Sequence, residues 1–335
     1  MKKIAMAVLC GNPIDTTSFY RGMGPLGTLS RNLVEFQMIT PPEYSWASLK
    51  LVHAVFMQRP FTRDQLQIAK LAKVNGKKLW VDYDDYLLAV PVDNPTVRIY
   101  DDNAKMVVRA ILGMADVITV STEFLAELLR KETKAPVTVI PNAFDDGMFK
   151  WRQPGQGVGT QPIIAWRGTD THVRDLMEVA QGFVDVNRTP DIKGWKFEFW
   201  GYRPFFIMDA LGDRVDFHPT MDVIDYHGAL TTSAPRIMVV PLSDSVFNRA
   251  KSNVAWLEGC MAGAVVVAPD WDEWKRPGII NYAGPHDFGR ALLEAMRLGQ
   301  EKLEKLNYAG WKEIQARYTL SRINGMRETL LWSLR

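Results

Sequence analysis

Residues 247–269 read FNRAKSNVAWLEGCMAGAVVVAP, and they follow a short apolar segment, RIMVVPL, at 236–242. The apolar segment predicts a buried β-strand. Ser252 is a good N-cap, so the sequence predicts a helix over 252–262, followed by a small-residue turn and a second strand at 264–269. A strand, a helix and a strand in this order are typical of a parallel sheet with helices packed on its faces.

The same alternation of short apolar segments with amphipathic segments extends along the rest of the chain. Strands are predicted at 4–10, 52–58, 78–83, 116–121, 137–141, 162–166, 196–200 and 215–218. Helices are predicted at 24–36, 62–74, 97–113, 122–132, 172–186 and 221–230, and the part from about 285 to 335 is predicted to be helical. The chain is therefore predicted to be an α/β protein of two doubly wound, Rossmann-like domains.

A change in composition marks the predicted boundary between the two domains. Residues 150–162, KWRQPGQGVGTQP, contain three glycines and two prolines, which is typical of a linker. An N-terminal domain at 1–152 and a C-terminal domain at 162–315 are expected on either side of it. Two such domains face a cleft, and ligands of open α/β sheets bind beyond the carboxyl ends of the strands.

The composition argues against several other classes of protein. The chain has 335 residues, of which 47% are hydrophobic and 23% charged, as in ordinary globular proteins. Its net charge of +2 gives no overall field for nucleic acid or membrane, and no apolar run approaches the ~20 residues of a membrane span. Cys10 and Cys260 lie far apart in apolar segments, which favours reduced core thiols and a cytoplasmic protein.

The start of the helix predicted over 252–262 has the chemistry of a phosphate-binding site. Its first N–H groups lack partners within the helix, and the helix dipole is positive there. Lys251 adds a full positive charge beside Ser252 and Asn253. Glu258 lies further along, where a carboxylate can accept hydrogen bonds from adjacent hydroxyls such as those of a ribose. The alternative is that Lys251 and Glu258 are solvated charges on an ordinary helix.

Together, these residues resemble the donor-binding segment of retaining glycosyltransferases with the GT-B fold, in the large group-four-like superfamily. Lys251 matches a basic residue that binds the nucleotide diphosphate in that family, and Glu258 with the Ala-Gly-Ala-Val-Val turn after it matches the ribose contact. Residues 163–176, IIAWRGTDTHVRDL, resemble the opening of the family's C-terminal domain, with Arg167 in the place of a diphosphate-binding residue. Residues 115–145 resemble the end of its N-terminal domain.

The resemblance implies transfer of a hexose from a nucleotide-diphosphate sugar, expected to be a UDP-sugar, to an acceptor hydroxyl with retention of configuration. It implies no essential metal, because basic residues and a helix end carry the leaving diphosphate in that family. It also implies that the C-terminal helix, 316–335, packs back on the N-terminal domain. Donor-binding positions are expected at Arg167, Gly168, Asn248, Lys251, Ser252, Asn253 and Glu258.

One position departs from the family pattern. The family usually carries two glutamates separated by seven residues, the first of which contacts the donor sugar. Here the second is Glu258, and the first position holds Ala250. Asn248 and Asp244 are the candidates to replace it. The departure concerns the identity of the sugar rather than the nucleotide site.

An acidic loop in the N-terminal half is a second part of the candidate site. Asp82, Asp84 and Asp85 cluster at the carboxyl end of a predicted strand. Such carboxylates could bind Mg²⁺ or Mn²⁺, or could merely be solvated loop residues. Because the resemblance argues against a metal, we assign them to the acceptor or to sugar hydroxyls.

Two further loops complete the candidate site. The loop at 15–31 contains Arg21, Gly22 and Gly24, and the resemblance places it against the donor phosphates or the acceptor. His172 begins a helix after a turn, at a position expected to face the cleft. The residues expected to be catalytic are Arg167, Lys251, Asp84 and His172.

The acceptor is indicated by weaker signals. Residues 50–78 carry seven basic residues and one acidic residue, as expected either of a solvated helix face or of a track for a phosphate backbone. Residues 80–95 resemble segments of phage-encoded glycosyltransferases. The leading hypothesis is therefore a 5-hydroxymethyl-pyrimidine in phage DNA, modified in the host cytoplasm. The alternatives are a polysaccharide or lipid-linked glycan acceptor, a sugar-nucleotide epimerase, and a non-catalytic protein that binds nucleotide sugars or DNA.

Overall fold

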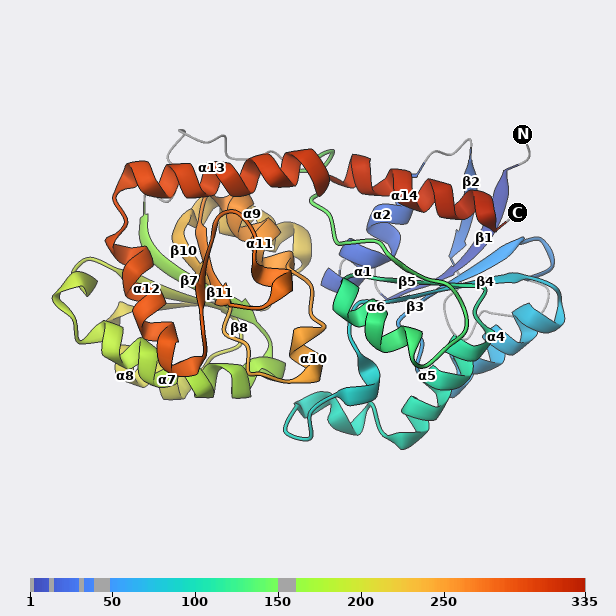
Figure 1. Ribbon diagram of the computed structural model, residues 1–335, viewed down its shortest axis with the longest axis horizontal. Coiled ribbons are helices and arrows are strands. Elements are labelled where there is room, and N and C mark those ends of the chain that lie inside the picture. Colours follow the sequence, from blue (N-terminus) through green and yellow to red (C-terminus); the bar gives the residue numbers. More distant parts are fainter. Residues whose placement is uncertain (1–2, 12–14, 30–32, 39–48, 150–160, 335) are drawn as a thin grey trace.

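The computed structural model describes residues 3–11, 15–29, 33–38, 49–149 and 161–334, and it contains two six-stranded parallel sheets (Figure 1). The strand order is β2-β1-β3-β4-β5-β6 in the first sheet and β12-β11-β10-β7-β8-β9 in the second. Every neighbouring pair is parallel. The prediction of two doubly wound α/β domains is confirmed. The linker was predicted at 150–162; residues 150–160 lie outside the described residues, and 161–162 belong to the strand β7.

The N-terminal sheet lies between two hydrophobic layers. Helices α4, α5 and α6 cover one face, while α2 and the C-terminal helix α14 cover the other. Its strands are β1 (Ile4–Leu9), β2 (Val34–Met38), β3 (Ala54–Gln58), β4 (Lys78–Tyr83), β5 (Val117–Val120) and β6 (Val137–Val139). Its helices are α1 (Thr16–Arg21), α2 (Met23–Gly27), α4 (Arg63–Val74), α5 (Asp102–Met114) and α6 (Glu123–Arg130).

The C-terminal sheet is covered in the same way. Helices α7, α8 and α12 pack on one face, and α11 and α13 on the other. Its strands are β7 (Gln161–Gly168), β8 (Lys196–Gly201), β9 (Val215–Pro219), β10 (Pro235–Val239), β11 (Val265–Pro269) and β12 (Ile279–Tyr282). Its helices are α7 (Val173–Asn187), α8 (Phe205–Leu211), α9 (Val223–Ser233), α10 (Val246–Arg249), α11 (Val254–Ala262) and α12 (Phe288–Arg297).

Two long helices return the chain to the domain in which it began. Helix α13 (Gln300–Arg317) and helix α14 (Leu320–Ser333) run along one side of both domains (Figure 1). Helix α14 buries Ile323 and Leu331 in the same cluster as Ile4 and Trp80 of the N-terminal sheet. The amide of Asn324 also donates to the Pro25 carbonyl at 2.9 Å. The expected crossing of the C-terminal helix is therefore confirmed.

Two predicted helices that include residues assigned to the site differ from the structure. The helix predicted over 24–36 ends early, because α2 covers only Met23–Gly27 and the strand β2 begins at Val34. Ser252 is not the N-cap of the helix that follows it: Asn253 holds that position, and α11 begins at Val254. Ser252 instead accepts a hydrogen bond from Asn142 across the two domains, at 2.7 Å, and so keeps its hydroxyl near the cleft.

Candidate functional site

A cavity of about 210 Å³ lies between the two domains, beyond the carboxyl ends of the strands of both sheets. The N-terminal domain contributes Thr16, Thr17, Tyr20, Arg59, Asp84, Asp85 and Asn142 to its lining. The C-terminal domain contributes Trp166, Arg167, His172, Val239, Val240, Pro241, Leu242, Lys251, Ser252, Val254, Ala255 and Trp274. A second cavity of about 220 Å³ shares Thr16, Arg167 and His172 with the first and adds Gly168 and Glu258.

These two cavities bring together eight of the predicted site residues. Arg167, His172, Lys251, Ser252, Asp84 and Asp85 line the first, and Gly168 and Glu258 are added by the second. Six predicted residues line neither cavity: Arg21, Gly22, Gly24, Asp82, Asn248 and Asn253.

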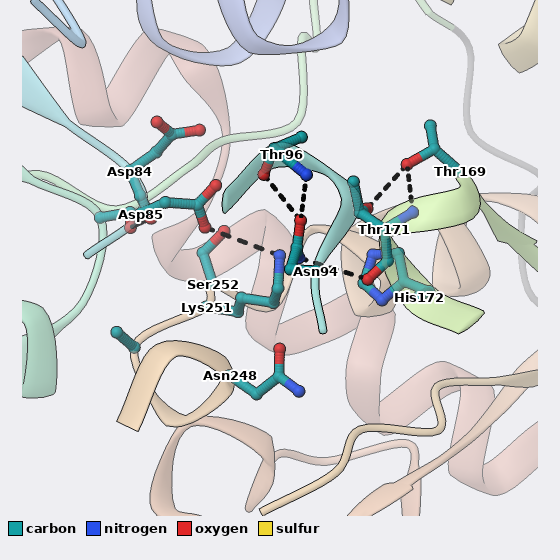
Figure 2. Close-up of polar contacts among 12 residues, drawn as sticks. Asp84, Asp85, Asn94, Thr96, Thr169, Thr171, His172, Asn248, Lys251 and Ser252 are labelled. Carbon is teal, nitrogen blue, oxygen red and sulfur yellow. Dashed lines mark hydrogen bonds and ion pairs between the residues drawn. The ribbon is translucent and has the colours of Figure 1, made fainter. Parts of the chain in front are cut away.

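A cluster of four charged side chains, Arg59, Asp84, Asp85 and Lys251, lies where the domains meet. Figure 2 shows Asp84, Asp85 and Lys251 of this cluster. Arg59 donates from Nε to Asp84 Oδ1 at 2.8 Å and from Nη2 to Asp85 Oδ2 at 2.7 Å. Lys251 reaches Asp85 from the opposite domain, with 3.7 Å between Nζ and Oδ1. This cluster links the loops after β3 and β4 to the loop that precedes α11.

The surroundings shift the pKa values of the Asp84 and Asp85 carboxyls in opposite directions. Burial raises the pKa of Asp84, and the neighbouring Asp85 adds to that effect against the opposing pull of Arg59. Burial also acts to raise the pKa of Asp85, but Lys251, Arg59 and His172 outweigh it and lower that pKa. Asp85 is therefore the more firmly ionised of the pair.

Arg59 is a site residue that the sequence analysis did not identify. It lay within the basic segment at 50–78, where nothing distinguished it from the lysines around it. The one available signal was its place directly after the strand β3, at the carboxyl edge of the sheet. Its φ of 46° is unusual for a residue with a side chain, and such backbone strain is concentrated at functional sites.

Glu258 lies at the boundary of the two domains with both carboxylate oxygens in use. Arg167 Nε donates to Oε2 at 2.8 Å, and the Tyr226 hydroxyl donates to the same oxygen at 3.2 Å. The Tyr20 hydroxyl of the N-terminal domain donates to Oε1 at 3.0 Å, and it also lies 3.1 Å from His227 Nε2. Glu258 is 1% exposed, so hydroxyls of a ligand reach it only by replacing a present partner.

His172 is held by a buried carboxylate. Its Nδ1 lies 2.7 Å from Asp175 Oδ2. The other Asp175 oxygen accepts from the Ser243 backbone N–H at 2.8 Å, from the Ser243 hydroxyl at 2.6 Å and from the Asn248 amide at 2.8 Å. Asn248, expected to bind the donor, thus supports Asp175 behind the cavity wall.

Arg21 and Asp82 form a buried ion pair below the cavity rather than part of its lining. Arg21 donates from Nε to Asp82 Oδ1 at 3.0 Å and from Nη2 to Oδ2 at 2.6 Å. Arg21 also donates to Asn142 Oδ1 at 3.2 Å, and Asn142 in turn donates to Ser252. The pair therefore supports a residue that lines the cavity.

The glycines of the same loop serve close packing of the backbone. A Cβ on Gly24 would lie 2.0 Å from the Phe19 carbonyl oxygen, so no larger residue fits there. Gly22 separates α1 from α2, and its N–H donates to the Ser18 carbonyl.

The residues named for the missing glutamate also lie away from the cavity. Ala250 is fully buried within the hydrophobic cluster of the N-terminal sheet, and its carbonyl accepts from the Thr122 hydroxyl at 3.0 Å. Asp244 forms an exposed pair with Arg249 at 2.6 Å. The carboxylates that face the first cavity are instead Asp84 and Asp85.

The described residues lack the features of a metal centre and of a membrane span. No group of three or more His, Cys, Asp or Glu side chains there is placed to hold a metal ion. Within the same residues, no helix combines the length and apolar character needed to cross a membrane.

Comparison with solved structures gives the fold a name. No protein-family model matches the chain, and no match to a curated protein was found. The chain is similar to sucrose-phosphate synthase from Thermosynechococcus elongatus, with a TM-score of 0.71 and 16% identity over 100% of this chain and 99% of that one. It is also similar to Anabaena HepE in complex with UDP, with a TM-score of 0.65 and 14% identity over 99% of this chain and 100% of that one.

A third solved structure has the same architecture over part of its length. The pneumococcal O-GlcNAc transferase GtfA, in complex with UDP and GlcNAc, matches with a TM-score of 0.59 and 13% identity over 86% of this chain and 58% of that one. At these identities the similarity establishes the fold, which is GT-B, and the prediction of that fold is confirmed.

Proposed function

We propose that this GT-B chain is a glycosyltransferase that takes a hexose from a nucleotide-diphosphate sugar, with a UDP-sugar as donor. The observation that carries the proposal is the meeting of Arg167, Lys251 and Glu258 at two adjoining cavities between the domains. Two of the similar structures are described as complexes with UDP, which supports the choice of nucleotide.

The donor enters a cavity whose charges already balance. Arg167 is paired with Glu258, and Lys251 with Asp85. The negative charge beside Lys251 is now that of Asp85, and a bound diphosphate can take its place. Donor binding therefore exchanges one anion for another at that ammonium group. The leaving diphosphate is then stabilised by cations that the fold holds in place, which is the main source of catalysis in this proposal.

The acceptor binds on the side of the N-terminal domain, where Asp84 and Asp85 can accept hydrogen bonds from its hydroxyls. Transfer proceeds with retention: the anomeric carbon loses its bond to the β-phosphate oxygen and gains one to the acceptor oxygen. The acceptor proton passes to the departing phosphate.

For the acceptor we propose the hydroxyl of a 5-hydroxymethyl-pyrimidine in DNA, and a glycan is the second candidate. One observation favours the glycan. Lys77 and Lys78 lie at the amino ends of the strands, opposite the cavity, and Lys73 and Lys78 are paired with Asp116. Those lysines therefore supply no continuous basic track toward the cavity, although Arg59 and Arg63 lie at its end of the sheet.

The test is donor turnover. The protein is incubated with UDP- and GDP-sugars, with and without DNA containing 5-hydroxymethyl-pyrimidines, and free nucleotide diphosphate is measured. Release that depends on the modified DNA supports both donor and acceptor, while release that depends on an added glycan supports the second acceptor. Donor binding without release of nucleotide diphosphate in any arm would overturn the assignment as an enzyme. It would favour a non-catalytic protein that binds nucleotide sugars. Conversion of the donor sugar without acceptor would point to an epimerase.

A matched pair of variants assigns any turnover to this cavity. Lys251→Met removes the ammonium group that faces the diphosphate, and we expect a loss of about 10- to 100-fold in kcat/KM, the usual scale for a charged hydrogen bond. Lys305→Met is the control, because Lys305 lies on the exposed face of α13 and pairs only with Glu301 among the described contacts.

A further inference from the structure

His172, Asp175, Ser243 and Asn248 form a unit that the donor chemistry above does not use. They come from four places: the turn after β7, the first turn of α7, the loop after β10 and the short helix α10. Asp175 is 3% exposed and accepts four hydrogen bonds, three of them on one oxygen. Such a network fixes the position of a carboxylate, and here it aims the remaining oxygen at His172.

This arrangement determines which nitrogen of His172 carries the proton. Because Asp175 Oδ2 can only accept, Nδ1 must donate to it. The other nitrogen, Nε2, is left to face the two cavities that His172 lines. No partner for Nε2 is found within the described part of the chain. In the neutral ring this nitrogen is an acceptor, and in the imidazolium it becomes a second donor.

We propose that His172 takes up a proton when a nucleotide diphosphate binds and then donates a hydrogen bond from Nε2 to the β-phosphate, with Asp175 as the residue that positions it. The inference rests on the proposed function, because the diphosphate is the donor's own. In the transfer step His172 keeps its proton. The sugar leaves the phosphate oxygen as described above, and the imidazolium stabilises the charge that remains there.

The charges around His172 explain why binding changes its protonation. Burial lowers the pKa of His172, and Lys251 and Arg167 add to that effect, while Asp175 opposes it. Asp85 also lies close enough for mutual attraction. A bound diphosphate brings two or more negative charges into the same space and compensates both Lys251 and Arg167. An anion within about 4–6 Å moves such a pKa by about 1–3 units, here upward.

The experiment measures protons and affinity together, with UDP as the probe. UDP is titrated calorimetrically into the protein at several pH values from 5 to 8, in buffers of different ionisation enthalpy. A rise in the pKa of one unit gives uptake of about 0.5 proton per UDP bound at the pH midway between the free and bound values. We expect that uptake in the wild type and in the control His286→Gln, whose side chain lies outside the cleft.

Two variants identify the groups responsible. Asp175→Asn keeps an oxygen for Ser243 and Asn248 but presents an amide to His172, which forces the proton onto Nε2 and leaves Nδ1 as the acceptor. His172→Gln removes the titrating group. We expect both to lose the proton uptake and to lower kcat/KM by about 10- to 100-fold, the scale of a charged hydrogen bond. A purely structural role for Asp175 would not remove uptake from a folded protein that still binds UDP.

The outcomes separate this inference from the function on which it rests. UDP binding with uptake that disappears in both variants supports it. UDP binding without uptake, or with uptake that persists in either variant, overturns it and leaves the glycosyltransferase proposal standing. Failure of UDP, GDP and their sugars to bind the wild type overturns the proposed function, and this inference with it.

Discussion

Ala250 stands where the family resemblance expects a glutamate, and its surroundings explain why none fits. Its methyl group belongs to the hydrophobic cluster of the N-terminal sheet. We therefore expect Ala250→Glu to bury an unpaired carboxylate, to cost several kcal/mol of stability and to restore no sugar contact. Thermal unfolding and donor turnover measure the two effects. Ala309→Glu on the exposed face of α13 is the control, and an Ala250→Glu variant of normal stability with raised turnover would contradict the interpretation.

Glu273 predicts a pH dependence of stability. Burial raises the pKa of this carboxyl to about 7, against the opposing pull of Arg276. The folded state therefore holds the proton more tightly than the unfolded state, so the free energy of unfolding falls as pH rises from about 4.5 to about 7. The fall is up to about 3 kcal/mol. Glu273→Gln lacks the titrating group, so its unfolding temperature should rise relative to wild type between pH 5 and pH 8.

The control for that measurement is Glu301→Gln, which changes an exposed carboxylate on α13. It should follow the wild-type profile throughout. Parallel profiles for wild type and Glu273→Gln would show that Glu273 titrates at its ordinary value in the folded protein.

The residues of the site were predictable to different degrees. Lys251 was identified from the start of the predicted helix and from the family resemblance, Arg167 from the resemblance, and His172 from its place at a strand-to-helix turn. The hydrogen-bond and ion-pair partners of site residues were not predictable, because they depend on which strands are neighbours in the sheet. Arg21 and Asp82 are 61 residues apart in sequence and meet only in the folded structure. Hydropathy indicates that a segment is a strand but does not give its place in the sheet.

At the scale of elements, the apolar strands were predicted well and the short polar ones were missed. The strands β3, β4 and β11 are almost entirely buried, so they form continuous apolar runs. In contrast, β2 has the sequence VEFQM and lies at the edge of its sheet, where half of its residues can be polar. The prediction of a helix over 24–36 is wrong at its end, because β2 begins at Val34.

Helix α14 should be an energetic part of the N-terminal domain. Leu331 is fully buried against the sheet of that domain, so Leu331→Ala should cost about 2–5 kcal/mol. Met326, on the same helix, is 40% exposed, and Met326→Ala should change stability by less than about 0.5 kcal/mol. Urea unfolding followed by tryptophan fluorescence compares the two variants. Equal and small effects would mean that α14 contributes little to the core.

At the scale of the whole molecule, several polar contacts join the domains directly. Asn142 donates to Ser252, Thr122 donates to the Ala250 carbonyl, and Lys251 is paired with Asp85. Tyr20 also reaches across to Glu258. The Thr122–Ala250 contact lies outside both cavities, whereas the other three contacts involve residues that line them. Two of these three, Lys251 to Asp85 and Tyr20 to Glu258, occupy groups that we assign to the donor, so donor binding must change them.

Tyr20→Phe tests that conclusion. The variant removes the hydroxyl that occupies Glu258 Oε1 and would compete with the ribose of the donor. We expect UDP to bind about 2- to 10-fold more tightly, the range of a typical hydrogen bond. Calorimetric titration measures the change, and Tyr308→Phe on the exposed surface of α13 is the control. Weaker binding would instead make Tyr20 a contact of the bound nucleotide.

The return of α14 to the first domain also determines the order in which the protein can mature on the ribosome. The strands of the N-terminal sheet are synthesised first, but one of its faces gains part of its cover only from residues 320–333. By then the whole C-terminal sheet has already been translated. The nascent first domain must therefore wait with apolar surface open to solvent or to a chaperone, and the second domain, although made later, can be the first to complete its core.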